Sequence, residues 1–250
     1  MDTPNAPEPL HLMAVAAHPD DIELTCGGTL IKMARAGYRT GVLDLTRGEM
    51  GTRGTPEQRL REAREAARIM GLTVRENAGL PDGWLSTEPD LKMVLVRALR
   101  KWRPALWLVP CSEERHPDHA AVGRAALDAA FLAGLRKIDT GQPMYRPTWI
   151  LQYLCRRDDD FSFIVDVSDS FEARLDAIRA YRSQFDPDSG DPQTYISRPQ
   201  FLDTVIARAR FYGSKIEAAY GEPFLSRETL RVDDPVAFLA GTRPDWATLR

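Results

Sequence analysis

Histidine is scarce in this sequence, and the marks of several common protein classes are missing. The 250 residues include only four histidines: His11, His18, His116 and His119. Three cysteines are too few, and odd in number, for a disulfide framework, which favours a reducing compartment and a cytoplasmic protein. No apolar run approaches the roughly 18 residues that a membrane helix needs. The first residues also lack the basic start and apolar stretch of a signal peptide.

A charge excess of either sign is absent as well. Lys and Arg number 33 against 36 Asp and Glu, so the formal net charge is −3. A general nucleic-acid binder needs a basic surface to neutralise phosphates, so this balance favours a small-molecule partner. Hydrophobic residues make up 43% of the chain, enough for one large core. We therefore expect a flexible leader over residues 1–10 and a single soluble domain over residues 11–250.

Short apolar runs alternate with helical patterns through the first half of the chain. The expected strands are 12–17, 40–46, 74–80 and 105–109, and the expected helices are 27–36, 56–70, 90–102 and 120–132. Thr55, Pro56 and Gln58 suit the N-cap, N1 and N3 positions of the helix over 56–70. This alternation predicts an α/β fold with a Rossmann-like, mostly parallel sheet and helices on both faces. Further strands are expected over 149–154 and 161–167, and further helices over 170–183 and 201–220.

Three of the four histidines lie in two short motifs rich in Pro and Asp. The motif HPDD at residues 18–21 follows the first expected strand, and the motif HPDH at 116–119 follows the strand over 105–109. Open α/β sheets bind ligands at the carboxyl ends of their strands, where the strand order reverses. If the first and fourth strands are neighbours, both motifs face one crevice. Two imidazoles and a carboxylate there suit catalytic Zn²⁺, whereas either motif alone is also compatible with a turn or a helix cap.

The two motifs resemble those of the LmbE-like or PIG-L deacetylases, zinc-dependent enzymes that remove an N-acetyl group from N-acetylglucosamine conjugates. Their hallmarks, an A-H-P-D-D loop after the first strand and a later H-P-D-H loop, are present at 17–21 and 116–119. The runs DLTRGEMGTRGT, LREAREAARIMG and ENAGLPDGWL are similar to the branch that acts on N-acetylglucosaminyl malate in bacillithiol biosynthesis. The likeness extends from Leu10 to Phe224.

The resemblance implies a role for each residue of the motifs. It assigns one Zn²⁺ per chain to three ligands: His18, Asp21 and His119. Asp20 would be the general base that takes a proton from the attacking water. His116 would stabilise the oxyanion and protonate the leaving nitrogen, while Asp118 holds the tautomer of His116 and favours its charged form. On geometry alone, Asp118 is equally well explained as a helix N-cap.

Three further residues are candidates for substrate binding. Arg59 matches a position that contacts the malate carboxylates in this branch, and a guanidinium fork suits a carboxylate. An arginine on a helix is otherwise commonly a solvated residue. Arg53 and Glu49 lie in the loop RGEMGTRGT and are candidates for contacts with sugar hydroxyls, or plain loop charges.

Some relatives place an oxyanion-assisting tyrosine before the final helix, where this chain has Phe201, and Tyr195 is the candidate replacement.

The resemblance leaves some alternatives open. The acetylated sugar could be N-acetylglucosaminyl malate, an inositol conjugate or a chitooligosaccharide. His and carboxylate ligands also accept Fe²⁺, Co²⁺ or Mn²⁺. Members of the family often form trimers or hexamers, so a homo-oligomer is expected. The alternative from another class is a non-catalytic nucleotide-binding module, although neither G-x-G-x-x-G nor G-x-x-x-x-G-K-[ST] follows any expected strand.

Overall fold

A seven-stranded mixed sheet forms the centre of the computed structural model, which describes residues 7–153 and 161–240. The strands in chain order are β1 (Leu12–Ala16), β2 (Thr40–Asp44), β3 (Val74–Asn77), β4 (Leu106–Pro110), β5 (Trp149–Tyr153), β6 (Phe163–Asp166) and β7 (Gly221–Ser226). Their order across the sheet is β3-β2-β1-β4-β5-β7-β6. Strands β1 to β5 pair in parallel, while β7 runs antiparallel to both β5 and β6.

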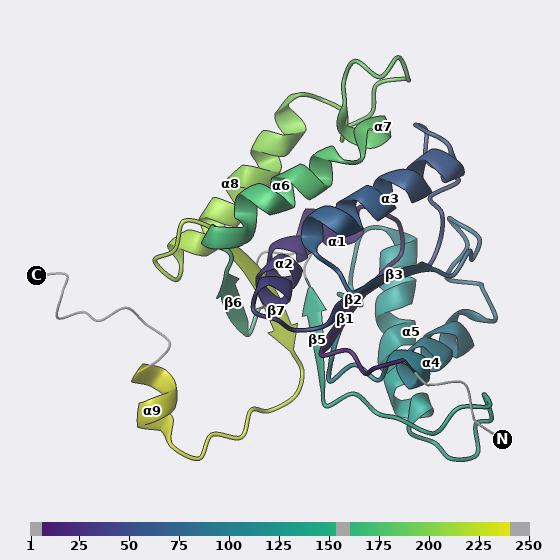
Figure 1. Cartoon of the computed structure of the whole chain (residues 1–250), viewed down its shortest axis with the longest axis vertical. Coiled ribbons are helices and arrows are strands. Elements are labelled where there is room, and N and C mark those ends of the chain that lie inside the picture. Colours follow the sequence, from purple (N-terminus) through teal and green to yellow (C-terminus); the bar gives the residue numbers. More distant parts are fainter. Residues whose placement is uncertain (1–6, 154–160, 241–250) are drawn as a thin grey trace, which may run out of the picture.

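Helices cover both faces of the sheet (Figure 1). One face is covered by α1 (Asp21–Thr25), α2 (Gly27–Arg35), α3 (Pro56–Met70), α6 (Phe171–Arg179), α7 (Arg182–Phe185) and α8 (Gln200–Ser214). The other face is covered by α4 (Leu91–Trp102) and α5 (Pro117–Ala133). A short helix, α9 (Pro235–Ala240), follows β7 away from these layers. The predicted α/β fold is therefore confirmed, and so is the expectation that the first and fourth strands are neighbours.

The two hydrophobic cores meet at β1. Leu12, Ala14 and Ala16 face the core under α2 and α3, while Met13 and Val15 face the core under α4 and α5. Because both faces of β1 are covered, the strand reads as an unbroken apolar run rather than as an alternating pattern. The same burial fixes the position of the residues that follow β1.

Most expected elements are present, with differences near their ends. The hydroxyl of Thr55 accepts a hydrogen bond from the Gln58 N–H at 3.2 Å, which confirms the predicted start of α3. The helix expected over 170–183 is divided into α6 and α7. The helix expected over 201–220 ends at Ser214, where Gly213 accepts from Ala218 and Glu217 takes a left-handed φ of 58°.

Some expectations fall outside the described residues. They include most of the leader over 1–10, the last residue of the strand expected over 149–154, and residues 241–250. Leu10 is described and belongs to the core: its side chain is buried and its N–H donates to the Trp102 carbonyl at 2.9 Å. Within the described ranges, no helix combines the length and apolar character needed to cross a bilayer.

Candidate active site

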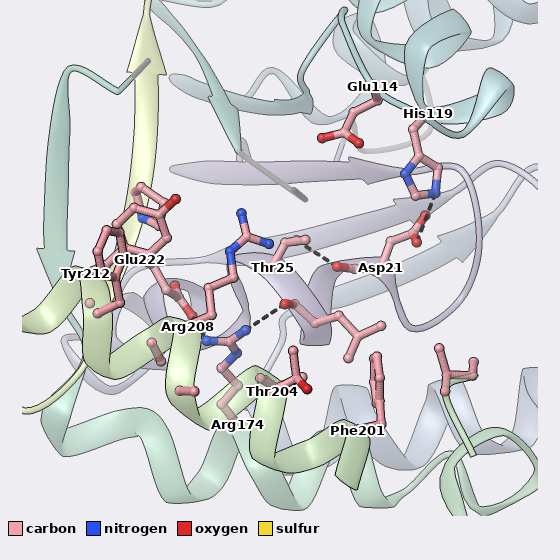
Figure 2. A pocket seen from close by; sticks show the side chains of 18 of the residues that line it. Asp21, Thr25, Glu114, His119, Arg174, Phe201, Thr204, Arg208, Tyr212 and Glu222 are labelled. Atoms are coloured by element: carbon pink, nitrogen blue, oxygen red, sulfur yellow. Dashed lines mark hydrogen bonds and ion pairs between the residues drawn. The ribbon is translucent and has the colours of Figure 1, made fainter. Parts of the chain in front are cut away.

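The two His-Pro-Asp motifs meet at the carboxyl ends of β1 and β4. Residues 18–21 form the turn from β1 into α1, and residues 116–119 form the first turn of α5. His18 Nδ1 lies 3.4 Å from Asp21 Oδ2 and 3.3 Å from His119 Nε2. His119 Nε2 lies 3.2 Å from Asp21 Oδ1, the contact drawn in Figure 2. The three ligand groups predicted from the motifs are thus within 4.8 Å of one another.

The donor set of this cluster fits a divalent metal ion. Two imidazole nitrogens and a carboxylate are a usual set for zinc, and three protein ligands leave a position for water or substrate. Burial alone would raise the pKa of Asp21, but the adjacent His119 and His18 hold this pKa well below its usual range. Asp21 therefore stays ionised, as a metal ligand needs to be.

A carboxylate that the sequence reasoning did not single out lies behind His18. Asp82 follows β3, and its Oδ1 lies 2.9 Å from His18 Nε2, the nitrogen turned away from His119. Asp82 Oδ2 accepts the Met50 N–H at 2.9 Å, and the Asp82 N–H donates to Glu49 Oε1 at 2.9 Å. A carboxylate on the far nitrogen of a ligand imidazole fixes its tautomer and orientation. Glu49, a predicted sugar contact, thus holds the loop that carries Asp82.

Asp20 is held in an unusual conformation beside the cluster. Its φ of 103° is in the left-handed region, which is uncommon for a residue with a side chain. The side chain is buried, and Oδ2 lies 3.0 Å from Arg59 Nη2. Burial raises the pKa of Asp20 to about 7, against the opposing effect of Arg59. A carboxylate with a pKa near neutrality has the protonation behaviour that a general base requires.

Arg59 and Arg53 both point into the protein. Arg59 is 5% exposed, and besides Asp20 it contacts the carbonyl oxygens of Pro19 and Gly48. Gly48 allows this close approach, since a Cβ there would lie 2.0 Å from Arg59 Nη1. Arg53 is 2% exposed and donates to the carbonyls of Ser183, at 2.8 Å, and Asp186. Neither guanidinium is the solvated surface charge considered as an alternative, and each would have to leave protein partners to bind a substrate.

His116 and Asp118 are not paired in the way that the resemblance implied. The Asp118 N–H donates to His116 Nδ1 at 3.2 Å, so His116 is the N-cap of α5 and its Nε2 carries the proton in the neutral form. The Asp118 carboxylate instead accepts the N–H groups of Gly83, at 2.8 Å, and Leu85, at 3.2 Å. Partial burial and the neighbouring His18 and His119 lower the pKa of His116. This outweighs the opposing effect of Asp118, so the neutral form of His116 is favoured.

A cleft of about 570 Å³ opens from the cluster and extends along α8 toward β7. Figure 2 shows Asp21 and His119 at one end of this cleft and Tyr212 with Glu222 at the other. Tyr195 and Phe201 both line it, with their rings 5.7 Å apart. The predicted replacement for the missing oxyanion tyrosine therefore lies in the same cleft as the cluster.

The chain is similar in sequence to a known protein family and in structure to a solved protein. A family model described as "PIG-L: GlcNAc-PI de-N-acetylase" matches residues 13–130, which include both motifs. The crystal structure of a conserved protein from Thermus thermophilus is similar, with a TM-score of 0.81 and 41% identity, covering 90% of this chain and 98% of that chain.

Relatives that are named as deacetylases are similar at lower identity. A diacetylchitobiose deacetylase of Thermococcus kodakarensis is 29% identical over 71% of each chain. A 1D-myo-inositol 2-acetamido-2-deoxy-α-D-glucopyranoside deacetylase of Saccharopolyspora erythraea is 27% identical over 80% of this chain and 89% of its own. A probable N-acetyl-α-D-glucosaminyl L-malate deacetylase of Bacillus cereus is 27% identical over 70% of this chain and 83% of its own.

Proposed function

This chain belongs to the PIG-L family of de-N-acetylases, and on that premise we propose that it removes the N-acetyl group of N-acetylglucosaminyl malate with a bound divalent metal ion. The enzyme is an N-deacetylase of substrates of the N-acetylglucosamine type. The observation that carries the proposal is the convergence of His18, Asp21 and His119 beside Asp20. The malate conjugate is supported by the sequence runs that resemble the bacillithiol branch and by the likeness to the Bacillus cereus protein.

Three side chains would hold the ion, namely His18, Asp21 and His119. Zinc is the first expectation for this donor set, although other divalent ions are compatible with it. When bound, such an ion polarises the amide carbonyl and lowers the pKa of a water molecule.

The chain's own residues then handle the protons. Asp20 accepts a proton from the water that attacks the carbonyl carbon, and Arg59 keeps the Asp20 carboxylate in place. His116 Nε2 carries its N–H on the side away from the capping bond at Nδ1, so it is the candidate hydrogen-bond donor to the oxyanion. A neutral imidazole does not give up this proton, so the leaving nitrogen takes the proton that Asp20 accepted from the water. Cleavage of the C–N bond then yields acetate and a free amine, and Asp20 is ionised again.

Acetate release by the metal-loaded protein tests this function. We expect the highest kcat/KM with N-acetylglucosaminyl malate, compared with diacetylchitobiose and N-acetylglucosaminyl inositol. The variants His18→Ala and Asp20→Asn should lose activity, and His18→Ala should also lose bound metal. His11→Ala is the matched control, because the His11 side chain lies outside the cluster, where Nδ1 accepts the Arg39 N–H at 3.0 Å and the ring packs against Tyr38. Full metal content and activity in His18→Ala would refute the site.

Cellular location and assembly are parts of the same proposal. We expect a cytoplasmic enzyme, because the three cysteines suit a reducing compartment. We expect a homo-oligomer, a trimer or hexamer, and no nucleic-acid or membrane partner. Light scattering of the purified protein measures the mass of the assembly, and a monomer at micromolar concentration would contradict the expectation.

A further inference from the structure

A buried arginine connects the loop between β2 and α3 to the segment that follows α7. Arg53 is 2% exposed, and its Nε donates to the Ser183 carbonyl at 2.8 Å. Nη2 donates to the Asp186 carbonyl at 2.5 Å and to the Ser189 hydroxyl oxygen. Nη1 lies 3.5 Å from the Pro192 carbonyl oxygen. A guanidinium carries five N–H donors in a fixed plane, so this one side chain reaches acceptors along the whole segment.

The two parts of the chain approach each other closely around Arg53. Gly54 has a left-handed φ of 69°, and a Cβ there would lie 2.7 Å from side-chain atoms of Ser183. The Gln184 side-chain amide donates to the Arg53 carbonyl at 2.7 Å. Glu62 of α3 accepts the Ser183 N–H at 2.8 Å, and Figure 1 shows α7 next to α3. Because these bonds already fix α7, the Arg53 guanidinium mainly holds the residues beyond it.

The loop that carries Arg53 is also bonded to the residues behind the metal-ligand cluster. The Met50 N–H donates to Asp82 Oδ2 at 2.9 Å, and Glu49 Oε1 accepts the Asp82 N–H at 2.9 Å. Asp82 Oδ1 in turn lies 2.9 Å from His18 Nε2. Hydrogen bonds therefore connect the cluster to this loop, and Arg53 connects the loop to the segment after α7.

The segment after α7 forms part of the wall of the cleft. Tyr195 and Ile196 line the same cleft as the metal-ligand cluster. The Tyr195 ring lies 5.7 Å from the ring of Phe201, which stacks on Phe185 at the end of α7, also at 5.7 Å. The cleft volume of about 570 Å³ is far more than an acetyl group fills, so the rest of a sugar substrate would lie against such walls.

We propose that Arg53 is a positioning residue, which holds residues 186–199 in place as a wall of the substrate cleft. It acts through this segment and not by contact with the substrate, and the inference rests on the proposed deacetylase function for the identity of that substrate. Residues 186–193, DPDSGDPQ, offer no large apolar side chain to the core, so the bonds from Arg53 determine their conformation. Without its guanidinium, the carbonyl groups that it binds would lose their donor.

Steady-state kinetics test the positioning role. In Arg53→Met, KM for N-acetylglucosaminyl malate should rise by about tenfold or more while kcat changes little, because the wall is displaced and the reacting groups are not. Arg53→Lys should recover part of the loss, because its ammonium group still donates hydrogen bonds. Arg182→Met is the matched control and should keep the wild-type KM, since it removes only an exposed ion pair with Asp186 of the same segment. An unchanged KM in Arg53→Met would overturn the inference.

Hydrogen exchange of the metal-free proteins separates this inference from the proposed function. Amides of residues 186–199 should exchange about tenfold faster or more in Arg53→Met, while those of α3 exchange as in wild type. Ser189→Ala removes one exposed acceptor and should give a smaller increase over the same residues. Wild-type exchange there in Arg53→Met would overturn the inference even if the enzyme is an active deacetylase. Faster exchange, without acetate release from any substrate by metal-loaded wild type, would support the positioning role and refute the proposed reaction.

Discussion

The two ring nitrogens of His18 have different neighbours, and this difference leads to a prediction about Asp82. Nδ1 faces His119 and Asp21, while Nε2 lies 2.9 Å from Asp82 Oδ1. An Asp82→Asn change removes the charge that fixes this tautomer. We expect the affinity for Zn²⁺ to fall by about 10- to 100-fold, measured by competition with a chromogenic chelator.

The control variant for Asp82→Asn changes another aspartate in the same loop. Asp90→Asn removes an exposed carboxylate that makes no capping bond to α4, so its metal affinity should equal that of wild type. Thermal unfolding of both variants, made metal-free with a chelator, checks that they fold. If Asp82→Asn folds normally and binds zinc as tightly as wild type, Asp82 does not position His18.

The ion pair between Arg59 and Asp20 predicts a shift in the pH profile. Asp20 must be ionised to accept a proton, so kcat/KM falls as the pH drops through its pKa. Burial raises this pKa to about 7, and the Arg59 guanidinium opposes the rise by favouring the ionised form. In Arg59→Met that attraction is lost, so the pKa rises further and the acidic limb of kcat/KM moves to higher pH.

Arg61 provides the comparison for this pH experiment. It lies on the exposed face of α3, two residues after Arg59, and Arg61→Met should leave the acidic limb where it is in wild type. An acidic limb at the same pH in Arg59→Met and wild type, in folded proteins, would show that Asp20 is not the titrating base.

The sequence was enough to identify the residues of the two His-Pro-Asp motifs, but not Asp82, which lies in the run ENAGLPDGWL with no histidine or second carboxylate near it after Glu76. His18, Asp21 and His119 follow strands whose ends meet, so strand order was enough to bring them together. Asp82 lies in a loop that reaches the cluster through bonds to Met50 and Glu49, and no spacing in the sequence reports such contacts. The ion pair between Arg59 and Asp20 could not be predicted for the same reason, because the sequence shows two charged residues but not that they are buried in contact.

At the scale of elements, α5 approaches β4 closely at a single glycine. A Cβ on Gly123 would lie 2.6 Å from the Pro110 carbonyl oxygen and 2.9 Å from backbone atoms of Cys111. Gly123→Ala gains helix propensity of about 1 kcal/mol but forces α5 away from the strand end. We expect a net loss of about 1–3 kcal/mol in the free energy of unfolding, measured with denaturant.

A change on the outer side of α5 is the control for this steric effect. Asp128→Ala removes an exposed ion pair with Lys92, in which both side chains are more than half exposed, so stability should change by less than about 1 kcal/mol. Because α5 also carries His119, Gly123→Ala should reduce zinc affinity, whereas Asp128→Ala should not. Equal stabilities of the two variants would show that α5 can move without cost.

Elements with strong periodic patterns were predictable, and β7 was not. The run at β1 is apolar on both faces, and the start of α3 has its own capping residues. Strand β7 contains Gly221 and Pro223 and directly follows the residues expected to be helical up to 220, so its sequence reads as the end of a helix and a turn. Its place between β5 and β6 depends on long-range contacts, among them the Glu222 bonds to α2.

At the scale of the whole molecule, the proposed metal site joins two distant parts of the chain, so metal binding should stabilise the fold. His18 and Asp21 follow β1, whereas His119 lies on α5, and only the folded chain brings them within 4.8 Å. A ligand that binds only the folded state adds about 2.7 kcal/mol at 100 times its Kd. For a chain of this size we expect added Zn²⁺ to raise the Tm of the metal-free protein by about 5–10 °C. His18→Ala should lose this rise while His11→Ala keeps it, and an equal rise in both variants would mean that the ion stabilises the protein from another site.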